Sequence, residues 1–132
     1  MSGIALACER GELDAVLAVC VVTRPDAGAV ARCRAHGVPA VVVAPEPAAD
    51  FHDRVDVALR AHGVQLVCLC GYLRHFRVDA WRDRAVNIHP ALLPDFGGAG
   101  MYGDRVHAAV IAAGRTESGC TVHWVDEEYD RG

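Results

Sequence analysis

Asn87 and His89 are the residues of this 132-residue chain best suited to chemistry, because they lie two apart at the end of a short apolar run that Pro90 ends. Side chains two positions apart in a strand point the same way, so both would face one ligand. An amide can donate a hydrogen bond to a carbonyl oxygen that becomes negative, and an imidazole can move a proton or add a second donor. The pair therefore suits a reaction at a carbonyl carbon, although a structural histidine at a strand end is the open alternative for His89.

A carboxylate beside His89 would orient the imidazole and stabilise its charged form. Asp130 is the candidate, since it follows an alternating segment, residues 119–125, whose end we expect at the same edge of the sheet. His107 and His123 could also approach this site, but their positions favour a packing role.

A glycine-rich segment, residues 96–103, leads into a helical pattern and at first resembles a phosphate-binding loop. It has neither the G-x-G-x-x-G nor the Walker spacing, and the chain contains no lysine. We therefore expect a mobile loop beside the site.

The elements that must hold these residues alternate between apolar runs and helical patterns. Short joints between them are typical of parallel βαβ units, and strands that are apolar on both faces need helices on both sides. This predicts an α/β fold, an open, mostly parallel doubly wound sheet in a three-layer sandwich, with the ligand crevice beyond the carboxyl ends of the strands. The expected strands are residues 16–23, 38–44, 64–70, 85–88 and 119–125, and the expected helices are 4–10, 27–36, 50–62 and 104–113.

Composition excludes several classes of protein. With 52% apolar and 23% charged residues the chain is not disordered, and 17 acidic against 13 basic residues argue against a nucleic-acid surface. We see no apolar run long enough to span a bilayer and no secretion signal, so we expect a cytoplasmic protein without a membrane partner. The six cysteines lack zinc-site spacing, since Cys68 and Cys70 are only two apart, so we expect free core cysteines and no metal.

Several motifs resemble the formyltransferase family that uses 10-formyltetrahydrofolate. Asn87-Ile88-His89-Pro90, followed by Leu92-Leu93-Pro94, resembles the core motif of that family, which formyltetrahydrofolate hydrolases share. Further segments resemble its phosphoribosylglycinamide formyltransferase branch, and the resemblance is collinear over almost the whole chain. These segments are residues 7–13, 24–29, 97–103 and 119–132.

The resemblance implies a Rossmann-like formyltransferase fold and transfer of a formyl group to the amine of glycinamide ribonucleotide in de novo purine biosynthesis. The co-substrate would be 10-formyltetrahydrofolate, with no metal. Asn87 would hold the oxyanion, His89 would be its general acid and electrostatic partner, and Asp130 would keep His89 protonated and help to remove the amine proton. Besides Asn87, the residues that would grip the folate, largely through backbone groups, are Leu73, Arg74, His75, Phe76, Asp126, Glu127, Glu128, Tyr129 and Asp130.

Departures from the family pattern accompany this resemblance. Ala91 stands where the family usually has serine, and Ala99 where it often has lysine. The first strand, the phosphate-holding loop and the C-terminal elements of the family have no counterpart in the sequence. We therefore expect residues 1–132 to form a single formyltransferase domain that is incomplete at both ends and by itself binds glycinamide ribonucleotide poorly.

The expected partners are small molecules only, and the expected assembly is a monomer or a homodimer. Two alternatives stay open on the same residues. One is a hydrolase that releases formate from the same folate, and the other is a non-catalytic folate-binding remnant.

Overall fold

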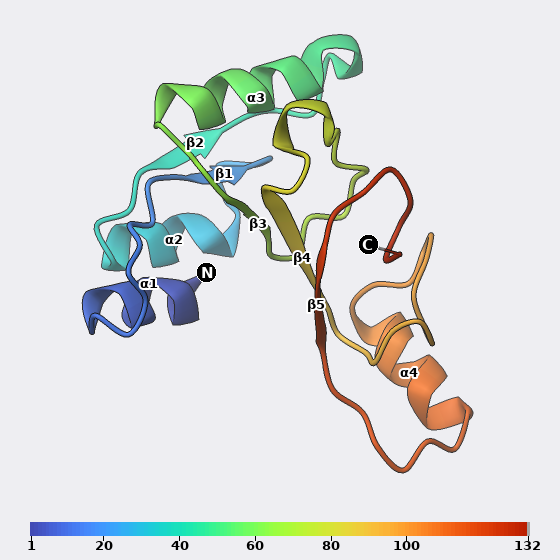
Figure 1. Cartoon of the computed structure of the whole chain (residues 1–132). Helices are drawn as coiled ribbons and strands as arrows, with labels where there is room; N and C mark the ends of the chain where they lie inside the picture. Colours follow the sequence, from blue (N-terminus) through green and yellow to red (C-terminus); the bar gives the residue numbers. More distant parts are fainter. Residues whose placement is uncertain (132) are drawn as a thin grey trace. The chain divides into compact units, whose positions relative to one another are not determined.

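The computed structural model describes residues 1–131, and the chain forms two compact units, Met1–Val64 and Gln65–Gly132. Each unit combines strands with helices (Figure 1). The elements of the first unit are α1 (Ser2–Glu9), β1 (Cys20–Val22), α2 (Gly28–Ala35), β2 (Ala40–Val42), a 3₁₀ turn (Ala48–Asp50) and α3 (Phe51–Ala61).

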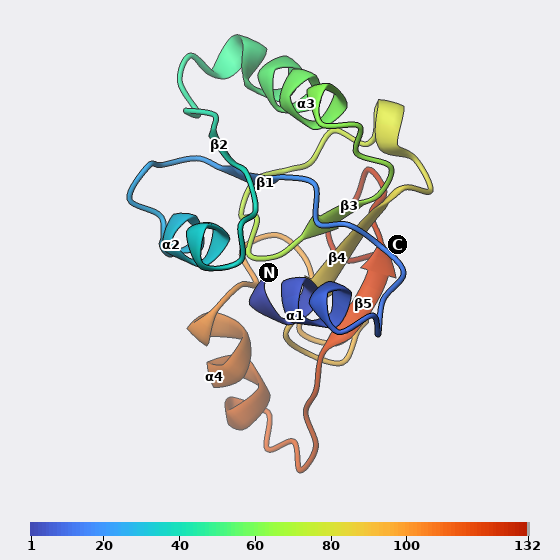
Figure 2. The same ribbon diagram turned by 90° about the vertical axis from the view of Figure 1, so that its left-hand side faces the viewer.

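The first unit is a parallel βαβ arrangement, as the sequence predicts. β1 and β2 pair in parallel, with Cys20 opposite Ala40, and α2 and α3 lie on opposite faces of this pair (Figures 1 and 2). Helix α3 buries Phe51, Val55 and Leu59, because residues four apart lie on one face of a helix.

The second unit contains β3 (Val67–Leu69), a 3₁₀ turn (Asp79–Trp81), β4 (Ala85–His89), α4 (Asp104–Ala112) and β5 (Thr121–Trp124). Its sheet has the order β3-β4-β5, and β3 runs parallel to β4. Val106 and Val110 of α4 are buried against Ala91, with Phe96 and Met101 packed around them. This small core fixes the chain that follows β4.

Strand β5 runs antiparallel to β4 and lies beside it (Figure 2). The register pairs His89 with Thr121 and Val86 with Trp124, so β5 ends beside the start of β4. Our reason for choosing Asp130, a strand end at the same sheet edge as His89, is therefore wrong. Asp130 reaches His89 because the chain turns back after β5.

The two faces of the β4–β5 pair differ in character because side chains alternate along a strand. Asn87 is paired with His123, and both point to one face together with His89. The opposite face carries exposed apolar side chains. They are Ile88, Val122 and Trp124, exposed by 44%, 65% and 53%.

Four of the five strands are shorter than expected, whereas β4 is one residue longer. The expectation that all six cysteines lie in the core is wrong. All six carry thiols outside any disulfide, but only Cys33 is buried, and Cys68, Cys70 and Cys120 are exposed. Cys68 lies in β3 and is nevertheless exposed, which an apolar sequence run does not reveal. Over the described residues, 1–131, no helix has both the length and the apolar character needed to cross a membrane.

Candidate active site

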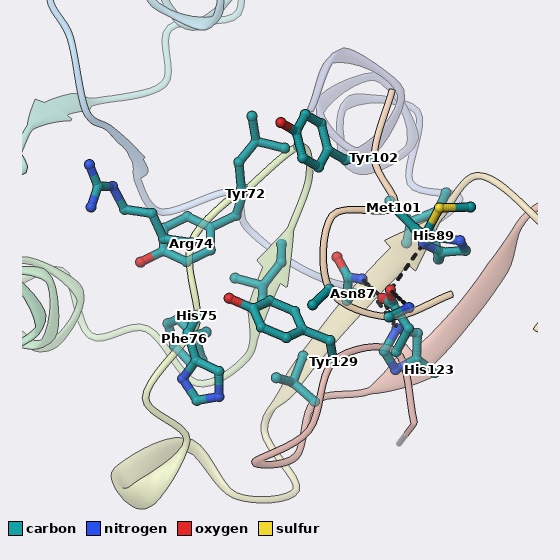
Figure 3. Close-up of a pocket in the computed structure, with 18 of the residues that line it drawn as sticks. Tyr72, Arg74, His75, Phe76, Asn87, His89, Met101, Tyr102, His123 and Tyr129 are labelled. Atoms are coloured by element: carbon teal, nitrogen blue, oxygen red, sulfur yellow. Dashed lines mark hydrogen bonds and ion pairs between the residues drawn. The ribbon is translucent and has the colours of Figure 1, made fainter. Parts of the chain in front are cut away.

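A cavity of about 490 Å³ lies within the second unit, at the end of β4 (Figure 3). Its volume is in the range of small-molecule sites. Four segments line it, and all of them include residues singled out from the sequence. They are residues 69–76, Asn87–Pro90, Gly98–Gly103 and 123–130.

Asn87, His89 and His123 lie close together in the wall of this cavity (Figure 3), and Asp130 contacts all three of them. Its Oδ2 accepts a hydrogen bond from the backbone N–H of Gly98 at 2.9 Å and lies 3.4 Å from Nδ1 of His89. Its Oδ1 lies 3.3 Å from Nδ2 of Asn87 and 3.6 Å from Nε2 of His123. The structure thus brings the expected trio together and adds His123 to it.

His89 is almost completely buried, with 3% exposure, and both ring nitrogens face acceptors. Nε2 donates to the carbonyl oxygen of Phe96 at 2.9 Å, and Nδ1 faces the Asp130 carboxylate at 3.4 Å. Only the imidazolium, with a proton on each nitrogen, can donate to both. These contacts therefore suit a positively charged His89 in the wall of the cavity.

The Asn87 amide is held by two neighbours through its nitrogen. Nδ2 lies 3.2 Å from Nε2 of His123 and 3.3 Å from Oδ1 of Asp130. We expected a packing role for His123, yet the sequence carries a signal for this position. Thr121 and His123 alternate with Val122 and Trp124, so the polar pair shares one face.

Local backbone geometry makes room for the Asp130 carboxylate. Asp130 itself has a φ of 55°, in the left-handed region that aspartate tolerates better than most residues. At Gly97 an added Cβ would lie 2.6 Å from Cδ2 of Leu93 and 3.1 Å from Cβ of Asp130. Glycine at position 97 therefore allows the loop and Asp130 to approach each other.

The expected folate-binding residues form a second wall, with one exception. All residues of the segments 73–76 and 126–130 line the cavity except Glu127. The side chain of Glu127 contacts Arg82 instead. Nε2 of His75 hydrogen-bonds the carbonyl oxygen of Glu127 at 3.0 Å, and its ring meets that of Tyr129 edge-on at 5.4 Å. These contacts join the two segments that we expected to bind the folate.

The pair of Arg82 and Glu127 fixes the outer end of this wall. Its hydrogen bond and charge lower the pKa of the Glu127 carboxyl below its usual value. Both groups are exposed, so solvent weakens the attraction. Tyr72, which also lines the cavity, has a buried hydroxyl without a hydrogen-bond partner among residues 1–131, and burial raises the pKa of this phenol.

The described side chains that line the cavity do not match the ligand set of a metal site. Within the part of the chain that the structure describes, no three His, Cys, Asp or Glu side chains are grouped so that they could hold a metal ion. The groups offered to a ligand are an amide, an imidazolium, a carboxylate and backbone groups.

The family model and the relatives that match this chain point to the same protein family. The family model described as formyl transferase matches residues 1–132. The chloroplastic phosphoribosylglycinamide formyltransferase of Arabidopsis thaliana is 41% identical over 133 residues, covering 95% of this chain and 45% of the relative. The phosphoribosylglycinamide formyltransferase of Bacillus subtilis is 36% identical over 125 residues, covering 90% of this chain and 62% of the relative.

A solved structure agrees with these relatives. Glycinamide ribonucleotide transformylase 1 from Symbiobacterium toebii superimposes with a TM-score of 0.90 at 34% identity, covering 99% of this chain and 62% of that one. The chain therefore spans only part of the length of the proteins it matches, 45% of the Arabidopsis relative and 62% of the Symbiobacterium one.

Proposed function

Because this chain belongs to the formyl transferase family, we propose that it acts in the transfer of a formyl group from 10-formyltetrahydrofolate to the amine of glycinamide ribonucleotide. This is a step of de novo purine biosynthesis, and the proposed partners are these two small molecules. The relatives' names support the substrate. The observation that carries the chemistry is the Asp130 cluster in the cavity wall.

In the proposed reaction the amine nitrogen forms a bond to the formyl carbon, and the carbonyl oxygen becomes an oxyanion. The bond from that carbon to the folate nitrogen then breaks, and that nitrogen takes up a proton. Negative charge therefore builds up and disappears on one oxygen, which is the charge that a preorganised site can stabilise.

Three residues supply what this reaction needs. The positive charge of His89, buried and held between Phe96 and Asp130, stabilises the oxyanion electrostatically. Asn87 donates a hydrogen bond to the same oxygen through Nδ2 once that nitrogen relaxes its long contact with Asp130. Asp130 balances the charge of His89 and, through water, helps to remove the proton from the attacking amine.

The second wall fits the folate. Residues 73–76 offer apolar surface and backbone groups, and the turn at 126–130 offers backbone groups on the other side of the cavity. Flat ring systems with several polar edges are bound well by such a combination. We propose Leu73, Arg74, His75, Phe76, Asn87, Asp126, Glu128, Tyr129 and Asp130 as lining contacts, and Glu127 as a contributor through its backbone carbonyl only.

The test combines folate binding with product analysis on the 132-residue chain. Binding of a stable 10-formyl folate analogue is measured by calorimetry, and transfer is followed by folate absorbance with and without glycinamide ribonucleotide. Transfer that depends on the ribonucleotide supports the proposal. Formate release that is independent of it shows a hydrolase instead, and folate binding without turnover that is unchanged in His89→Ala shows a non-catalytic binding protein.

A further inference from the structure

His123 is a buried titratable residue that has no role in the proposed reaction as described above. It lies in β5 directly opposite Asn87, and its side chain is only 6% exposed. Each of its ring nitrogens has one neighbour within hydrogen-bond distance, the carbonyl oxygen of Trp124 at Nδ1 and Nδ2 of Asn87 at Nε2, while Oδ1 of Asp130 lies farther from Nε2, at 3.6 Å.

The tautomer of His123 follows from its first neighbour. Nδ1 lies 2.8 Å from the carbonyl oxygen of Trp124, which can only accept, so Nδ1 carries a proton. In the neutral ring Nε2 then has a lone pair, and that lone pair faces Nδ2 of Asn87 at 3.2 Å.

This lone pair distinguishes the two ends of the Asn87 amide, which are nearly identical in shape. The NH₂ end can donate to Nε2, whereas the oxygen end would be repelled by it. Oδ1 of Asp130, at 3.3 Å from Nδ2, favours the same orientation. An inverted amide would present its oxygen to the developing oxyanion and would oppose the reaction.

We propose that His123 is a positioning residue that turns the amide of Asn87 so that its nitrogen serves the reacting centre. One amide hydrogen of Asn87 is donated to Nε2 of His123. The other makes the longer contact with Asp130 and can move to the oxyanion. This inference rests on the proposed function for its catalytic meaning, but the hydrogen bond itself exists independently of any activity.

The first test is therefore spectroscopic and uses the full ¹⁵N-labelled chain without substrate. We expect the side-chain amide of Asn87 to show a downfield, slowly exchanging proton and a coupling across the hydrogen bond to the Nε2 nitrogen of His123. Both features should vanish in His123→Leu, while His123→Gln, whose side-chain oxygen can still accept, should keep the shifted proton. The matched control is His107→Leu, an exposed histidine of α4 outside the cavity lining.

The second test is kinetic. His123→Leu should lower kcat about ten- to a hundredfold through misorientation of one catalytic group, with the KM for folate unchanged, and His123→Gln should recover most of the loss. In an Asn87→Ala background, His123→Leu should cause no further loss, since its effect passes through Asn87.

An Asn87 amide signal that is unchanged in both His123 variants would overturn the proposal. So would a His123→Leu effect that multiplies with that of Asn87→Ala. If no variant and not even the parent chain transfers formyl groups, the proposed function fails, while the amide signal still decides whether His123 orients Asn87.

Discussion

At the scale of single residues, Asp130 gathers the most contacts in the site, because its two oxygens face Gly98, His89, Asn87 and His123. Asp130→Asn keeps the shape and tolerates the same positive φ, but it removes the charge. We expect turnover to fall at least about a hundredfold, as when a proton-transfer group is lost, with little change in Tm. Asp83→Asn is the matched control, because Asp83 also has a positive φ but lies outside the cavity lining.

The two polar residues of β4 belong to the same scale. Asn87→Ala and His89→Ala should each lower turnover at least about a hundredfold, the usual loss for an oxyanion donor or a charged partner. Folding of each variant is checked by circular dichroism, since His89 is buried. Activity within about tenfold of the parent would contradict the assigned role of that residue.

At the scale of elements, the loop after β4 and the turn after β5 must approach closely, and Gly97 permits this. In Gly97→Ala the new methyl would lie 2.6 Å from Cδ2 of Leu93 and 3.1 Å from Cβ of Asp130, so the Leu93 side chain must rotate away and Asp130 must shift slightly. We expect a loss of about 1–3 kcal/mol in the free energy of unfolding, together with a marked loss of activity. Gly3→Ala in α1, where an added Cβ meets nothing within 4 Å, should keep both stability and activity.

The exposed pair of Arg82 and Glu127 joins the turn at residues 126–130 to the 3₁₀ turn before β4. Because Arg82 lowers the pKa of Glu127, the pair stabilises the fold above the ordinary carboxyl pKa, and this contribution is lost as pH falls through the lowered value. Arg82→Gln should bring the pKa of Glu127 back up, as measured by NMR titration. Arg24→Gln in the first unit should leave that titration unchanged, and added salt should mimic Arg82→Gln in part.

Some features of the elements could be predicted from the sequence, and others could not. Apolar runs and glycine stops predict the α/β class, and the spacing of Asn87 and His89 predicts their shared face. The direction of β5 could not be read, because an alternating segment pairs equally well in either sense. The role of His123 depends on that direction and on its register opposite Asn87, which only the folded strand pair defines.

At the scale of the whole molecule, the reactivity of the six cysteine thiols shows how completely the chain is folded. Thiol labelling at neutral pH should modify Cys120 quickly, whereas Cys33, with 1% exposure, should react only after unfolding. Cys68 should react more slowly than its exposure suggests, because partial burial and the neighbouring Cys70 raise the pKa of its thiol and reduce the thiolate fraction. Mass spectrometry of the peptides gives each rate, and rapid labelling of Cys33 in the native protein would contradict the described core.

The alternation of β5 determines which insertions and deletions its gene can tolerate. Residues 111–120 are all exposed, so one residue gained or lost in the loop within this stretch changes its length and little else. One residue gained or lost within Thr121–Trp124 would shift the pairing by one position and turn Val122 or Trp124 toward Asn87. An insertion or deletion of one residue should therefore be tolerated in the exposed loop before β5, whereas the same change within β5 should disrupt the candidate active site.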